Sequence, residues 1–105
     1  MTNPLKGQVP FESDGRALTA VLDFNSLCSL EPHFPGIMKG EMDLTSPTAI
    51  RRVFHTALIR HHPEVDELAA GDIIQSIGLE KAGEVIGQAI TASFPEAAKG
   101  KTDPR

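Results

Sequence analysis

The chain has 105 residues, a formal net charge of −4 and a hydrophobic content of 40%. This length is sufficient for one domain with a buried core and is short of the size at which chains divide into several domains. The excess of acidic residues argues against nucleic acid as a partner, because binding to phosphates requires clustered Lys and Arg. The basic residues are scattered, and Arg51 and Arg52 form the only adjacent basic pair.

Cysteine use and hydropathy indicate the compartment. The single cysteine, Cys28, cannot form an internal disulfide, and no basic and then apolar leader opens the chain. No run reaches the roughly 18 apolar residues that a membrane-spanning helix needs. We therefore expect a cytoplasmic protein without membrane contact, in which Cys28 is a small core residue among leucines.

The first predicted elements form a β-hairpin. Residues 7–12 and 17–22 alternate apolar and polar side chains, and Asp14-Gly15 between them is a strong turn signal. Pro10 has no N–H, so its strand should lie at an edge or carry this residue on the unpaired side. An isolated hairpin is marginally stable in water, so helices should cover at least one of its faces.

A short helix and an apolar loop follow the hairpin. Asp23 suits the N-cap of a helix over about residues 24–31, which should bury Phe24, Leu27, Cys28 and Leu30. Two prolines and two glycines predict a loop over residues 32–44, with one helical turn near Ile37-Met38. Its apolar residues either fold back on the core or bind a partner. The candidate partner-binding residues are Phe34, Ile37, Met38 and Met42.

Three further helices are predicted. Ser46-Pro47 starts a helix that ends near His61-His62 and exposes Arg51, Arg52, Thr56 and Arg60; its inward residues are Ile50, Val53, Phe54, Ala57 and Leu58. The next helix covers residues 65–77 and stops at Gly78, with Leu68, Ala69, Ile73, Ile74 and Ile77 inward. The last covers residues 79–93 and buries Leu79, Ala82, Val85, Ile86, Ala89 and Ile90.

The remaining segments complete the expected organisation. Gly83 and Gly87 stand four residues apart in the last helix, which allows another backbone to approach closely. Residues 1–6 should be a loose lead-in, and the polar residues 95–105 a disordered C-terminal tail. We thus expect a single α+β domain over residues 1–94, in which an N-terminal β-hairpin is followed by three to four helices.

Residue types that carry chemistry show no catalytic or metal-binding spacing. His55, His61 and His62 sit six and seven apart rather than three or four, so they do not suit one helix face as metal ligands. His61 and His62 should instead interact with the carbonyl groups at a helix C-terminus. Asp72 lies mid-helix among apolar residues and should face water or pair with an Arg of the preceding helix. We expect no cofactor and no enzymatic activity.

A helix-turn-helix interpretation is disfavoured. Two helices are joined by a short turn that contains a proline, but the would-be recognition helix "VDELAAGDIIQSIG" has three acids and no Lys or Arg. Phosphate groups would repel it.

Several segments in order resemble one family. The opening "MTNPLKGQV", the turn "SDGR", and the segments "LDFNSLCSLE", "HHPE", "AAGDIIQSIG" and "SFPE" are similar to the small tail assembly chaperones of gene transfer agents and related siphophages. The resemblance covers about residues 3–94. Residues 32–44 depart from it, since the family would have a more polar turn there.

The resemblance implies a non-enzymatic protein of the bacterial cytoplasm that acts during assembly of a phage-like tail. Such a protein would bind the tape-measure protein, help recruit tail tube subunits, and have no cofactor. A hairpin edge or an apolar groove suits contacts of this kind, with a tail protein or with another copy of the chain. The alternatives are a small structural component of the tail and a regulatory or ligand-binding module, in which the loop around residues 33–42 closes on a ligand.

Overall fold

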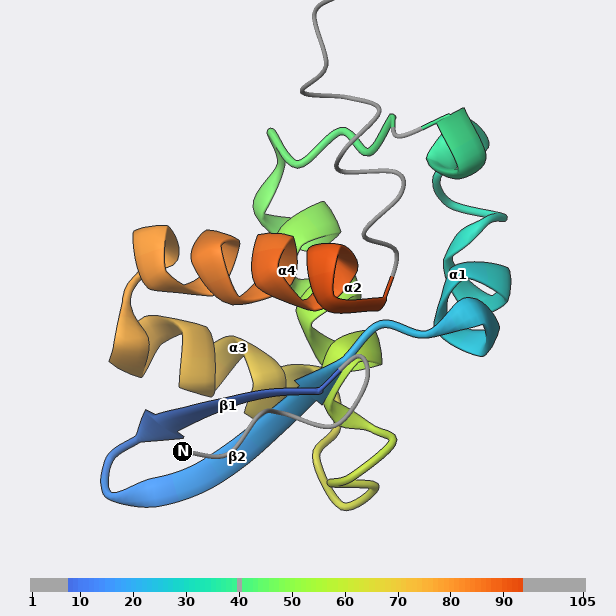
Figure 1. Ribbon diagram of the computed structural model, residues 1–105. Coiled ribbons are helices and arrows are strands. Elements are labelled where there is room, and N and C mark those ends of the chain that lie inside the picture. Colours follow the sequence, from blue (N-terminus) through green and yellow to red (C-terminus); the bar gives the residue numbers. More distant parts are fainter. Residues whose placement is uncertain (1–7, 40, 94–105) are drawn as a thin grey trace, which may run out of the picture.

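The computed structural model describes residues 8–39 and 41–93; the predicted lead-in at residues 1–6 and the predicted tail at residues 95–105 lie outside them. The chain forms an antiparallel hairpin followed by helices, which confirms the α+β prediction (Figure 1). The elements in order are β1 (Gln8–Ser13), β2 (Arg16–Val21), α1 (Phe24–Leu30), the 3-10 helix η1 (Ile37–Lys39), α2 (Pro47–Leu58), α3 (Glu67–Ile77) and α4 (Leu79–Ser93).

The hairpin turns at the predicted residues. Asp14 and Gly15 have φ angles of 53° and 78°. Positive φ at both central positions gives a turn whose twist matches the right-handed twist of the flanking strands. The resulting register places Val9 opposite Ala20 and Phe11 opposite Leu18.

One face of the hairpin is covered by helices. Val9, Leu18 and Ala20 are buried in the core, and α2 and α4 pack against the strands from that side (Figure 1). On the opposite face Pro10, Glu12 and Ala17 are exposed. The helices therefore supply the cover that an isolated hairpin lacks.

The helix caps explain where three helices begin. Asp23 accepts a hydrogen bond from the Ser26 backbone N–H, and the Ser26 hydroxyl accepts one from the backbone N–H of Asp23. Ser46 accepts from the N–H of Ala49 ahead of Pro47. Each side chain satisfies a donor that the first turn of a helix leaves free. Asp66 caps α3 in the same way, so α3 begins at Glu67 rather than at residue 65.

The core is mostly aliphatic, and Phe54 and Phe34 are its buried aromatic side chains. Phe54 on α2 is fully buried, and its ring meets the ring of Phe11 edge-on at a centroid distance of 5.8 Å. Burial of one large apolar side chain stabilises a fold by about 1.5 to 3 kcal/mol. The other large side chains that are fully buried are Leu18, Leu22, Leu30, Val53, Leu58, Val85 and Ile86.

Several burial predictions are wrong. Phe24, Cys28, Leu68 and Leu79 are exposed rather than inward, so Cys28 is not a core residue. Phe24, Leu68 and Leu79 all lie in the first turn of their helices. Thr56 is buried instead of exposed, and its hydroxyl donates a hydrogen bond of 2.9 Å to the carbonyl group of Arg52. This bond satisfies its polar group within the helix.

Candidate functional site

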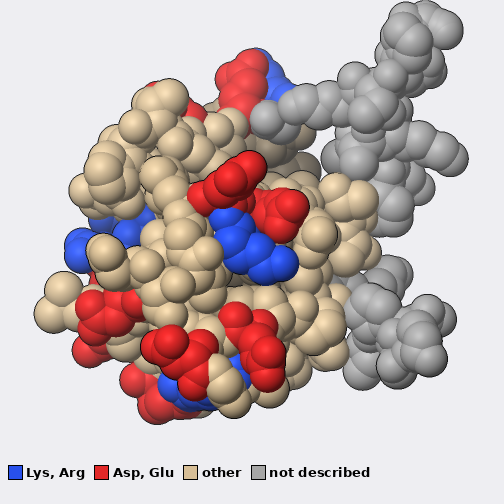
Figure 2. All heavy atoms as spheres, turned by 90° about the vertical axis from the view of Figure 1, so that its left-hand side faces the viewer, with Lys and Arg blue, Asp and Glu red and all other residues tan. Residues whose placement is uncertain are grey.

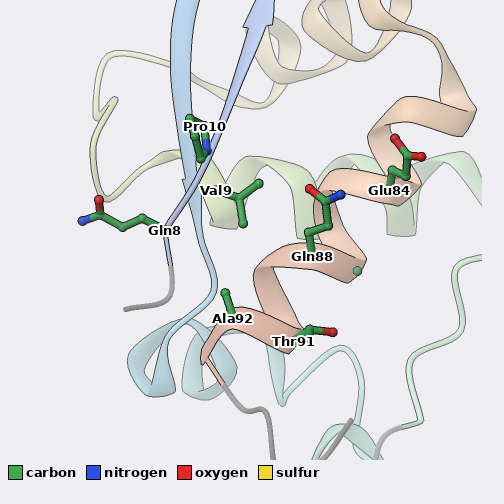
Figure 3. A pocket seen from close by; sticks show the side chains of 8 residues that line it. Gln8, Val9, Pro10, Glu84, Gln88, Thr91 and Ala92 are labelled. Atoms are coloured by element: carbon green, nitrogen blue, oxygen red, sulfur yellow. The ribbon is translucent and has the colours of Figure 1, made fainter. Parts of the chain in front are cut away.

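An open groove lies between β1 and α4. It has a volume of about 620 Å³ and is lined by Gln8, Val9, Pro10, Glu84, Gly87, Gln88, Thr91 and Ala92. Figure 3 shows Val9 of β1 facing Gln88 and Ala92 of α4, while the side chain of Gln8 points away from α4. The groove is thus bounded by a strand on one side and by a helix on the other.

The helical wall follows from the sequence of α4. Its inward residues include Ala82, Val85, Ile86 and Ala89, which leaves Gly83 and Gly87 on the exposed side. A methyl group at either glycine would meet no atom of the described residues within 4 Å, apart from neighbouring atoms of its own helix. Among residues 8–39 and 41–93, no other backbone makes the predicted close approach at Gly83 or Gly87. The backbone of α4 is instead open to a partner at these two positions.

Pro10 determines which backbone groups β1 presents at the edge of the groove. In an antiparallel pair, residues that do not exchange hydrogen bonds point their backbone groups outward. Pro10 lies opposite Thr19, whose N–H bonds to His62 instead of to β1. The outer edge of β1 consequently lacks a donor at Pro10. This protects the edge against pairing with another strand, so contacts at the groove would be made by side chains.

The charges near the groove are mixed. Glu84 lies on its rim, and its carboxylate is 3.6 Å from the ammonium group of Lys81. The face shown in Figure 2 carries Lys and Arg beside Asp and Glu, without a broad patch of one sign on the described part of the chain. Exposed pairs of this kind contribute little to stability and leave the charges available to a partner.

The candidate partner-binding residues do not form one surface. Phe34 and Ile37 are buried in the core, and Met42 packs against it. Met38 is exposed over 68% of its surface. The predicted helical turn is present as η1, and the loop folds back on the core around it. Binding of a partner by this loop stays a prediction, and only Met38 presents a largely exposed side chain for it.

Two polar expectations for α2 and α3 have different outcomes. Asp72 is exposed to water, which was one of the two alternatives predicted for it, the other being a pair with an Arg of the preceding helix. The ion pairs between the helices are made by Glu67, whose carboxylate oxygens lie 3.6 Å from Arg51 and 3.7 Å from Arg52. Glu67 stands at the start of α3 and lies beside the first half of α2, and this proximity is a tertiary feature that periodicity does not reveal.

The histidines contact the rest of the chain separately. His55 lies 3.0 Å from the carbonyl oxygen of Val65, His61 lies 3.2 Å from the side-chain amide of Gln8, and His62 accepts a hydrogen bond from the N–H of Thr19. The backbone N–H groups of His61 and His62 bond to the carbonyl group of Leu58 at the end of α2, as predicted for these residues, while their side chains contact the hairpin instead of the helix carbonyl groups. Among residues 8–39 and 41–93, no three His, Cys, Asp or Glu side chains are arranged to hold a metal ion.

Most of the groove was not predicted as a site. The sequence pointed to Gly87 through its spacing from Gly83, but gave no signal for Gln8, Pro10, Gln88 or Thr91. These residues become neighbours only because α4 crosses the hairpin (Figure 1). A pattern of exposed residues on a helix does not report what lies beside it.

Comparison with protein-family models, with curated proteins and with solved structures finds no match for this chain. Within the part of the chain that the structure describes, no helix combines the length and the apolar character needed to cross a membrane.

Proposed function

We propose that this protein is a non-enzymatic tail assembly chaperone of a gene transfer agent or a related phage-like particle. It binds an amphipathic helix of the tape-measure protein, keeps that protein soluble, and helps recruit tail tube subunits around it in the bacterial cytoplasm. The sequence resemblance motivates this function. The groove between β1 and α4 is the observation that carries the proposed binding mode.

The shape of the groove suits a helix. Packed helices lie 8 to 10 Å apart, according to the side chains at their contact. Gly83 and Gly87 present no side chains, so a partner helix can lie close to α4. Helix-in-groove binding uses apolar anchors spaced three or four residues apart on one face of the partner. Pro10 and Ala92 supply apolar surface for such anchors, and Glu84 on the rim favours a basic residue beside them.

Coexpression tests this function. The protein is produced together with the tape-measure and tail tube proteins encoded near it, and soluble tape-measure protein is measured. We expect the wild type to keep the tape-measure protein soluble and to copurify with it. Gly87→Leu should abolish both effects, because the new side chain fills the groove, while the helix itself tolerates leucine better than glycine.

Ser76→Leu is the matched control, since it also adds a leucine to an exposed helical position, on α3 and outside the lining of the groove. It should behave as the wild type. If the tape-measure protein is soluble without this chain and does not copurify with it, the chaperone function is wrong. If Gly87→Leu binds as well as the wild type, the function stands and the groove is not the binding surface.

A ligand-binding module is the second candidate. The groove volume of about 620 Å³ falls within the range of small-molecule pockets, which is about 300 to 1,000 Å³. A ligand that binds only the folded state raises the unfolding temperature. A thermal-shift screen with metabolites should give a stabilising ligand that Gly87→Leu no longer binds. The absence of any shift would argue against this candidate.

A further inference from the structure

His62 lies between the hairpin and the α2–α3 loop, residues 59–66. The backbone N–H of Thr19 donates a hydrogen bond of 3.0 Å to Nε2 of His62. An acceptor nitrogen carries no proton, so the imidazole is neutral and its proton is on Nδ1. Nδ1 lies 3.9 Å from a carboxylate oxygen of Glu64, which favours this tautomer.

Protonation affects the three contacting histidines differently. The carbonyl oxygen of Val65 can only accept, so Nε2 of His55 is a donor and keeps its contact when the ring gains a proton. His61 faces the side-chain amide of Gln8, which can turn to offer either its oxygen or its nitrogen. His62 faces a backbone N–H that cannot turn. A proton on its Nε2 would set a donor against a donor.

The bond to His62 occupies a free edge of the hairpin. Thr19 lies opposite Pro10, so its N–H points away from β1 and has no partner within the sheet. The side chain of His62 is 16% exposed, which shields this donor from water. The α2–α3 loop is also held to β2 by the ion pair between Arg16 and Glu64. The loop thus covers the outer edge of β2 through the titratable acceptor and the Arg16–Glu64 ion pair, and a second ion pair, between Arg60 and Asp23, holds it beside the end of β2.

We propose that His62 is a pH-sensitive latch that holds the α2–α3 loop against the outer edge of β2 when neutral and releases the Thr19 N–H when protonated. This inference does not depend on the proposed function. It makes acid pH a condition under which the β2 edge becomes free to pair with another strand.

The groups that face His62 set the pH of the transition. Partial burial lowers the pKa of His62 below its ordinary value; the carboxylate of Glu64 opposes this effect, and the positive charges of Arg16 and His61 add to it. A histidine whose pKa is lowered by folding binds its proton more readily in the unfolded chain. Its contribution to stability is therefore complete above about pH 6.5 and is lost as the pH falls through the pKa of the folded state.

Nuclear magnetic resonance of the full chain tests the latch. The amide shift of Thr19 and the ring shifts of His62 are followed between pH 8 and pH 5, together with the exchange rate of the Thr19 amide relative to its intrinsic rate. We expect both sets of shifts to move with one midpoint below about pH 6.5. Protection of the Thr19 amide should fall about fivefold, which corresponds to the loss of one hydrogen bond.

Two single variants test whether the pH response of the Thr19 amide comes from His62 or from other groups that titrate in acid. His62→Gln offers a neutral oxygen acceptor that does not titrate, so the Thr19 amide should keep its shift and protection at every pH. His61→Gln removes the neighbouring imidazole, whose charge helps to lower the pKa of His62, so the Thr19 amide and the His62 ring should still move together, with a midpoint somewhat above that of the wild type. A Thr19 amide that stays constant while the wild-type His62 ring titrates, or one that moves equally in His62→Gln, would overturn the proposal.

Discussion

At the residue scale, position within a helix decides whether an apolar side chain is buried. Phe24, Leu68 and Leu79 fit the apolar period of their helices, yet all three are exposed in a first turn. Periodicity assigns a side chain to a face of the helix. It does not report whether the neighbouring element extends far enough to cover that turn. The inward residues in the middle of α2 and α4, such as Phe54 and Val85, could be predicted, because neighbouring elements cover the middle turns of these helices.

Alanine substitutions at Phe24 and Phe54 test this conclusion, because they remove the same side chain from an exposed first turn and from a buried central turn. Phe54→Ala should lower the free energy of unfolding by about 3 to 5 kcal/mol, because it leaves a cavity in the core. Phe24→Ala should change it by less than about 0.5 kcal/mol, since Phe24 is 59% exposed. Urea unfolding of the two variants measures both effects. Similar losses would show that α1 buries Phe24, as its period predicts.

At the element scale, the ends of the helices could be predicted better than their surroundings. Ser46-Pro47, Asp23 and Gly78 mark helix boundaries through local chemistry: caps satisfy free N–H groups, and Gly78 has a φ of 97° that favours glycine. The exposure of Gly83 and Gly87 could not be predicted. Two glycines four residues apart are compatible with close packing of another element of the chain and equally with an exposed helix surface. The packing of α4 on the hairpin decides between them.

Alanine at Gly83 and Gly87 tests this open surface. Glycine within a helix costs about 0.5 to 1 kcal/mol relative to alanine, and a methyl group at either position has free space around it. Each of Gly83→Ala and Gly87→Ala should therefore raise the free energy of unfolding by about that amount, with a rise of several degrees in the unfolding temperature. Thermal and urea unfolding give both values. A loss of stability would mean that a neighbouring element packs closely against these glycines.

At the scale of the whole molecule, hairpin and helices depend on each other. The sequence predicts an α+β arrangement because one turn signal separates two alternating segments and apolar helices follow. It leaves open whether the apolar side chains of the loop over residues 32–44 fold inward; Phe34 and Ile37 do, whereas Met38 is exposed. The groove also arises at this scale, since β1 and α4 are separated in sequence by the whole helical region. Single-element patterns carry no information on such a pairing.

The most direct test of the proposed function is site-specific photocrosslinking during coexpression with the tape-measure protein. A photoreactive residue replaces Gln88, whose long side chain lines the groove, in one variant and Ser76 on α3 in the other. We predict a covalent product with the tape-measure protein from position 88 and none from position 76. A product from position 76 alone, or none from either position while the tape-measure protein is present and soluble, would contradict the account.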